Sequence, residues 1–173
     1  LALANYYEAA SEGPQGMRAV SQVVLNRVSH PAFPKSVCDV VFQGSDRSTG
    51  CQFTFTCDGS LARPAIPAIM DRARAIAVEA LQGRVESSVG MATHYHTKQV
   101  VPYWSASLDK IKVLGAHIFY VWHGGWGSRS AFRGRYVGEM SAVADRFLGI
   151  QKADALPMIA AEAVSTQFGS GPQ

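Results

Sequence analysis

The chain of 173 residues lacks any uninterrupted apolar run close to the ~20 residues that a membrane-spanning helix requires. A protein that crosses a bilayer by helices is therefore excluded. Charge is also sparse, at 17% of residues, and the basic side chains are scattered singly although the formal net charge is +3. Without a basic stripe, the sequence gives no support to nucleic-acid binding. Strand and helix patterns do not alternate as a dinucleotide-binding fold requires.

Cysteine is scarce as well. The three cysteines, Cys38, Cys51 and Cys57, lie close together, and their odd number leaves at least one thiol unpaired within a monomer. Their clustering favours one disulfide and an oxidising compartment, with all three pairings open and three reduced thiols as the alternative. A zinc site made of cysteine alone lacks a fourth thiol. Residues 1–20 show no secretion signal, which leaves open an export segment upstream.

Apolar residues recur at helical or strand spacing along most of the chain, and 47% of its residues are hydrophobic, which predicts one compact domain. We expect helices over residues 2–12, 14–28, 66–81, 139–148 and 153–168, a helical turn at 37–42, and strands over 52–56, 91–97 and 116–122. The sequence thus predicts a helix-dominated α+β fold with a small sheet.

Two glutamates, Glu8 and Glu12, stand four positions apart and so share one face of the first expected helix. Like charges at this spacing raise each other's affinity for a proton, and burial against aromatic rings adds to the effect. A carboxylic acid that donates a proton near neutrality is one interpretation. The other is an ordinary solvated helix face, with Glu12 paired to Arg18, Arg27 or a backbone amide.

Histidines and aromatic residues concentrate between residues 91 and 104. Strand alternation places His94 and His96 on one face and Tyr95 on the other. The two imidazoles could ligate zinc with His117 or His123 as the third ligand, and such a site would make the chain a zinc-dependent amidase or peptidase.

Tyr103 and Trp104 follow this segment and are candidates for an exposed surface that stacks on sugar rings. Packing in the core is the more common role of such aromatic residues. A surface of this kind would also suffice for a binding module without catalysis.

Several sequence blocks follow one another along the chain in the order in which they occur in a known protein family. They are residues 7–13 (YEAASEG), 22–28 (QVVLNRV), 30–34 (HPAFP), 51–59 (CQFTFTCDG), 92–97 (ATHYHT), 103–104 (YW) and 115–120 (GAHIFY). Together they resemble the SleB/CwlJ-type cell-wall hydrolases, whose catalytic domain is similar to the lysozyme-like fold of lytic transglycosylases. The resemblance implies a small antiparallel sheet and a catalytic domain over residues 1–125. It does not extend to residues 126–173, whose two helical patterns predict a C-terminal helical extension packed on the same domain, with a cover over the cleft as the alternative.

The resemblance also implies a reaction. The catalytic glutamate of the family maps onto Glu8, which would cleave the β-1,4 bond between N-acetylmuramic acid and N-acetylglucosamine, as an acid first and a base second. This lytic transglycosylase route requires no cofactor, no metal and no second carboxylate. Glu12 follows Glu8 along the same helix edge and is poorly placed to face it across a sugar, so it is expected to have a supporting role at most.

By the same resemblance, Gln52, Phe53 and Thr54 look like the segment that crosses the cleft and holds the sugar amide. A core strand is the alternative for Phe53. Tyr95 and His96 lie near the position of a pocket tyrosine in related enzymes, and a slip of one residue in register would decide which of them faces inward.

The expected partner is therefore the peptidoglycan glycan strand, with no nucleic acid, no membrane span and a monomeric chain. The expected location is periplasmic, cell-wall-associated or secreted. Two alternatives stay open at this point: a zinc-dependent cell-wall amidase or peptidase built on His94, His96 and His117, and a wall-binding module without catalysis.

Overall fold

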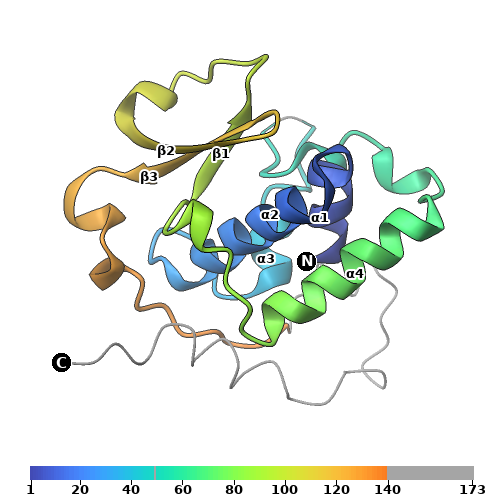
Figure 1. Cartoon of the computed structure of the whole chain (residues 1–173), viewed down its shortest axis with the longest axis horizontal. Helices are drawn as coiled ribbons and strands as arrows, with labels where there is room; N and C mark the ends of the chain where they lie inside the picture. Colours follow the sequence, from blue (N-terminus) through green and yellow to red (C-terminus); the bar gives the residue numbers. More distant parts are fainter. Residues whose placement is uncertain (49, 140–173) are drawn as a thin grey trace.

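The computed structural model describes residues 1–48 and 50–139 (Figure 1). Its helices are α1 (Ala2–Ala9), α2 (Gly13–Ser29), α3 (Val37–Val41) and α4 (Pro67–Leu81), and its strands are β1 (His94–Thr97), β2 (Leu108–Leu114) and β3 (His117–Trp122). Short 3₁₀ turns lie at Ala10–Glu12, Thr54–Thr56, Ser60–Ala62, Ser87–Val89, Ser105–Ser107, Gly124–Gly127 and Arg129–Ala131. The strands form one antiparallel sheet in the order β1-β3-β2. The predicted helix-dominated α+β fold with a small antiparallel sheet is confirmed.

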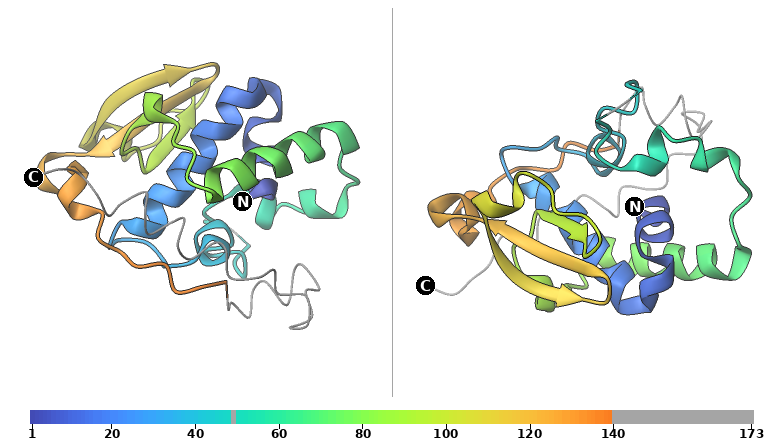
Figure 2. Two further views of the ribbon diagram at one scale, coloured as in Figure 1. Left: turned by 60° about the horizontal axis from the view of Figure 1, so that its bottom comes forward. Right: turned by 90° about the horizontal axis from the view of Figure 1, so that it is seen from above.

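Helix α2 is the central element of the fold. Thirteen of its 17 residues are buried, so it must be covered on nearly every side. The sheet lies on one side of α2, and α1 and α4 lie on the other (Figures 1 and 2). Ala19 and Val23 pack with Phe119 on the sheet side, whereas Val20 and Val24 belong to the larger core formed with the other helices.

Buried polar side chains of α2 hold the segment that leads into β1. The Asn26 Nδ2 group donates to the carbonyl oxygens of Gly90 and Ala92 at 2.9 and 2.8 Å. Gln22 accepts from the backbone amide of Glu86 at 3.0 Å and donates to Asn26 at 3.0 Å. Because buried backbone groups need partners, these contacts fix the path of residues 86–92 and the start of β1.

The β2–β3 hairpin turns through Gly115 and Ala116, since Leu114 pairs with His117. Gly115 has a φ of +54°, a conformation that favours glycine. A Cβ atom at this position would also collide with the Glu12 carboxylate. Glycine is therefore required at this turn both by the backbone and by its neighbour.

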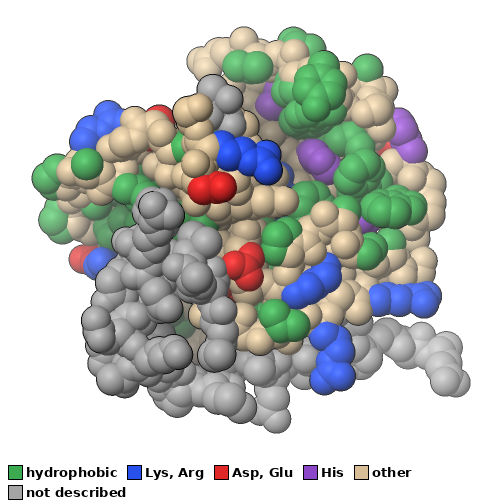
Figure 3. Space-filling model, turned by 180° about the vertical axis from the view of Figure 1, so that it is seen from behind, with side chains coloured by type: hydrophobic (Ala, Val, Ile, Leu, Met, Phe, Trp, Pro, Cys, Tyr) green, Lys and Arg blue, Asp and Glu red, His purple; other side chains and the backbone are tan. Residues whose placement is uncertain are grey.

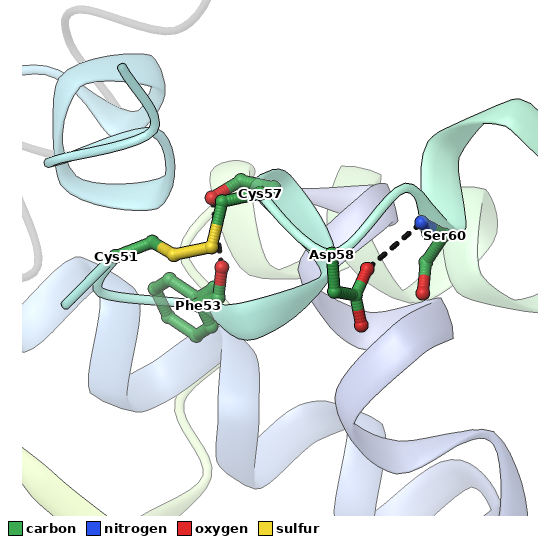
Figure 4. The surroundings of a disulfide bond; sticks show 6 residues. Cys51, Phe53, Cys57, Asp58 and Ser60 are labelled. Carbon is green, nitrogen blue, oxygen red and sulfur yellow. Dashed lines mark hydrogen bonds between the residues drawn. A yellow bond between two sulfur atoms is a disulfide. The ribbon is translucent and has the colours of Figure 1, made fainter. Parts of the chain in front are cut away.

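The strand expected over residues 52–56 is wrong. Thr54–Thr56 form a 3₁₀ turn, in which the Thr56 hydroxyl donates to the Phe53 carbonyl oxygen at 2.7 Å. A disulfide between Cys51 and Cys57 closes this segment (Figure 4). Cys38 is a free thiol. The bridge and the local threonine bond override the strand propensity of the β-branched and aromatic residues.

Strand β2 was not expected, and the helices expected over 139–148 and 153–168 lie outside the described residues apart from Glu139. Residues 132–139 run without helix or strand. Gly134 donates to the carbonyl oxygen of Ser29 at 2.7 Å, and the Glu139 carboxylate accepts from the amides of Val37 and Cys38. Within the described ranges, every helix is too short or too polar to traverse a lipid bilayer.

The Asn26 contacts predict a stability effect. Asn26→Leu removes the donor to the carbonyl groups of the exposed Gly90 and the buried Ala92, so the free energy of unfolding should fall by about 1 to 3 kcal/mol. Urea denaturation measures this change. The exposed Gln15→Ala substitution on the same helix is the control and should change stability by less than about 0.5 kcal/mol; equal effects of the two variants would contradict the role given to Asn26.

Candidate active site

Glu8 lies near the end of α1, half-buried, and its carboxylate contacts the sheet. The Tyr95 hydroxyl of β1 donates to Glu8 Oε2 at 3.0 Å. The two residues are 87 positions apart in the chain. Their contact joins the helical part of the molecule to the sheet.

A pocket with a volume of about 120 Å³ opens beside this pair. It is lined by Glu8, Arg27, Gln52, Phe53, Thr54 and Tyr95. The fold therefore brings together five of the residues that sequence reasoning selected, from α1, β1 and the segment between the disulfide cysteines. Phe53 is only 3% exposed and packs in the core without belonging to a strand, and it also lines the pocket.

Two tyrosines of α1 hold the disulfide-containing segment and the residues after it next to Glu8. Tyr7 stacks on Phe55 with ring centroids 4.7 Å apart and donates its hydroxyl hydrogen to the Ser60 carbonyl oxygen at 3.0 Å. The hydroxyl of Tyr6 accepts from the amide of Ile66 at 3.0 Å. Asp58 accepts from the Ser60 amide at 2.8 Å and shapes the next turn (Figure 4).

The register of the sheet decides whether Tyr95 or His96 of β1 faces inward. Tyr95 pairs with Phe119 and His96 with Ile118. The Tyr95 ring packs edge-on against His117 and tilted on Phe119, on the side of the sheet that meets Glu8. His96 points to the other side, where Tyr120 and the Thr97 carbonyl oxygen occupy its two ring nitrogens, each at 2.8 Å.

The outer side of the sheet carries an aromatic cluster that does not line the pocket. Trp104 lies edge-on or tilted against His94, His96 and Tyr120. Tyr103 is 97% exposed beside it. Hydrophobic and histidine side chains gather in this part of the surface (Figure 3). Thus His96, Tyr103 and Trp104 are not brought to the pocket beside Glu8.

The geometry does not support the zinc alternative. His94 and His96 contact Trp104 on the outer side of the sheet, whereas His117 packs against Tyr95 on the inner side. Three ligands of one tetrahedral ion must converge within about 2 Å of it, and these cannot. Over residues 1–48 and 50–139, no other group of three His, Cys, Asp or Glu side chains is placed to hold a metal.

Burial is the main influence on the titration of Glu8. It raises the pKa of Glu8 above the ordinary 4.5, and the Tyr95 hydrogen bond and the charge of Arg27 oppose the rise, whereas Asp58 adds to it. Burial and the nearby Glu8 also raise the pKa of Tyr95 well above 10.0, so its hydroxyl stays a donor. This arrangement favours a protonated Glu8 that can act as a general acid.

Sequence reasoning missed Arg27 as a pocket residue. It extends from α2, is only 4% exposed, and donates through Nε to the Thr93 carbonyl oxygen at 2.7 Å. Burial lowers the pKa of Arg27 to about 10, so it remains charged at neutral pH. The available signal was a basic residue within a helical stretch rich in valine and leucine, since arginine is rarely buried without a partner.

Glu12 has a structural partner. Its carboxylate accepts from the Ala116 amide at 3.0 Å, which is one of the alternatives that the sequence left open. Glu12 thus anchors the β2–β3 turn to the 3₁₀ turn after α1. Its carboxylate does not line the pocket.

The model of the family described as cell wall hydrolase matches residues 11–120. The chain belongs to this family. The spore cortex-lytic enzymes of Halalkalibacterium halodurans and Bacillus subtilis are 32% and 30% identical to it over 119 residues, or 69% of the chain. The chain spans only about a third of the length of these curated relatives, 33% and 35% respectively.

Two solved structures are similar over the same share of the chain. The catalytic domain of the Bacillus cereus SleB protein is 29% identical, with a TM-score of 0.55 over 69% of this chain and 84% of that one. The catalytic domain of the germination-specific lytic transglycosylase SleB from Bacillus anthracis is also 29% identical, with a TM-score of 0.56 over 69% and 88%. The resemblance stated from the sequence motifs is confirmed.

The raised pKa of Glu8 predicts how its removal affects stability. A carboxyl group with a higher pKa in the folded state stabilises the fold below the unfolded pKa, and this contribution is lost as pH rises through the folded pKa. Glutamine does not ionise, so the Glu8→Gln variant does not lose this stability at high pH. Its free energy of unfolding should equal that of the wild type near pH 4 and exceed it near pH 8. Urea denaturation at both pH values measures the difference. Glu79 on α4 does not line the pocket and is paired with Arg18 and Arg84, so Glu79→Gln should show no such pH-dependent gain.

Proposed function

We propose that this chain cleaves the β-1,4 bond between N-acetylmuramic acid and N-acetylglucosamine in peptidoglycan as a lytic transglycosylase, with Glu8 as its catalytic acid and then its base. The observation that carries the proposal is a half-buried carboxyl group with a raised pKa, held by Tyr95 at the edge of a pocket. Membership of the cell-wall hydrolase family supports the substrate class. It also favours an enzyme over a wall-binding module without catalysis.

A single carboxylate suits the anhydro-forming route. Hydrolysis by the usual two-carboxylate mechanism needs a second acidic group about 5–9.5 Å away across the sugar. Of the residues that line the pocket, Glu8 alone is acidic. The Glu12 carboxylate is engaged by the Ala116 amide, and the Asp58 carboxylate caps the turn at Ser60.

The steps follow from the position of Glu8. Protonated Glu8 donates to the glycosidic oxygen as the bond to the muramyl anomeric carbon breaks. The substrate's own N-acetyl group stabilises the positive charge that develops at that carbon. The Glu8 carboxylate then accepts the proton of the muramyl C6 hydroxyl, whose oxygen closes the 1,6-anhydro ring. Glu8 ends protonated, so the cycle needs no other acid or base.

Residues that surround Glu8 would position the sugar. Gln52 and Thr54 line the pocket, and a side-chain amide and a hydroxyl can hydrogen-bond an acetamido group. Tyr95 orients Glu8 and covers it from the sheet side. Sugar contacts by His96, Tyr103 and Trp104 remain predictions for more distant parts of a glycan strand.

We also propose that the chain acts as a monomer in the periplasm, on the wall or outside the cell. The Cys51–Cys57 disulfide supports an oxidising location. The proposed catalytic domain covers residues 1–125, and the helical extension proposed for 126–173 lies largely outside the described residues.

Digestion of purified peptidoglycan tests the reaction. The wild type should release muropeptides with anhydro-muramyl ends, one water lighter than reducing ends by mass spectrometry. Glu8→Gln should lower the rate by at least about a hundredfold, because general acid catalysis contributes 10²–10⁴-fold. Glu79→Gln is the matched control and should digest at the wild-type rate. Reducing ends as the sole product would disprove the anhydro route, and full activity of Glu8→Gln would disprove the assignment of the acid.

A further inference from the structure

Arg27 is a buried cation that contacts no carboxylate among residues 1–48 and 50–139. Its guanidinium lies between the rings of Phe33 and Phe53, with Cζ 5.3 and 5.4 Å from the two centroids. Its Nε group is bonded to Thr93, but Nη1 is buried with no hydrogen-bond partner in the described part of the chain. A buried charge without a paired carboxylate is costly for a fold. Such a cost points to a function at the pocket that Arg27 lines.

Among the described residues that influence the titration of Glu8, Arg27 is the only cation. Tyr95 faces Glu8 from β1, Arg27 from α2 and Asp58 from the segment after the disulfide. Tyr95 stays neutral, and Asp58 is an exposed anion. When Glu8 gives up its proton, the carboxylate that remains depends on the Tyr95 hydroxyl and on Arg27 for stabilisation.

We propose that Arg27 is the fixed counter-charge of Glu8, a positioning residue that stabilises the Glu8 carboxylate formed during the reaction. Arg27 makes no ion pair with Glu8 within the described structure. A direct pair would hold Glu8 ionised and unable to donate. A guanidinium nearby without contact lowers the cost of the ionised form of Glu8 without holding Glu8 ionised. This inference rests on the proposed function of Glu8 as acid and base.

Two variants separate charge from structure. Arg27→Gln removes the charge and keeps a donor for the Thr93 carbonyl, and Arg27→Lys keeps the charge. For Arg27→Gln, the basic limb of the pH profile of kcat/KM should move up by about 1 pH unit, as expected when a nearby opposite charge is lost. The maximal rate should fall by about tenfold, the equivalent of one pKa unit. For Arg27→Lys, the limb should stay near its wild-type position. Equal losses in both folded variants with an unmoved limb would show a merely structural role and overturn the proposal.

An NMR titration tests the proposal even if the Arg27→Gln variant does not fold. In ¹⁵N-labelled wild-type protein, the guanidinium resonances of Arg27 should titrate with the midpoint of Glu8, and in Glu8→Gln they should not move over the same pH range. Unchanged resonances in the wild type across the Glu8 titration would overturn the proposal. The NMR titration uses no substrate, so it tests the role of Arg27 separately from the proposed reaction. The proposed reaction is tested by digestion with Glu8→Gln, whose full activity would disprove it.

Discussion

The hydrogen bond between the Tyr95 hydroxyl and the Glu8 carboxyl group is the contact on which the site depends. It joins α1 to β1 across the pocket, so the position of the acid is set by both parts of the fold. On the helical side, Tyr7 holds α1 against the disulfide segment. On the sheet side, Asn26 and Arg27 of the buried α2 fix residues 90–93 immediately before Tyr95. The same helix thus supports the core and aligns the strand that covers the acid.

The site retains two features that oppose stability. A buried carboxyl group with a raised pKa loses stability as pH rises, and a buried guanidinium without an anionic contact has a desolvation cost. The apolar contacts of α2 on both of its sides compensate for them. Burial raises the pKa of the carboxyl group, and the nearby unpaired cation lowers the cost of its ionised form. The chemistry of the pocket follows from that balance.

Much of the fold could be predicted because helical periodicity is strong in α2 and α4 and because β3 is apolar on both faces. Strand β2 was missed although Lys110–Val113 alternate charged and apolar residues, a pattern typical of an edge strand. Residues 52–56 have strand composition, but a disulfide and a threonine hydroxyl bend them into a turn. Such long-range or covalent constraints do not show in local propensity.

The site was also predictable only in part, because long-range contacts place some of its residues. Glu8 could be selected from its spacing and from a motif, and Gln52 and Thr54 from the same resemblance. The inward direction of Tyr95 depends on its pairing with Phe119, which one strand alone does not reveal. Arg27 was missed because a helical pattern predicts the helix face on which a residue lies, but not whether its side-chain donors have hydrogen-bond partners.

Titration of the Glu8 carboxyl carbon by ¹³C NMR tests the central claim most directly, with the resonance assigned by its absence in Glu8→Gln. The account predicts a midpoint clearly above 4.5, in the pH range where wall digestion begins to decline. A midpoint at or below 4.5 would mean that Glu8 is ionised when the protein works, and it would contradict a proton-donating Glu8.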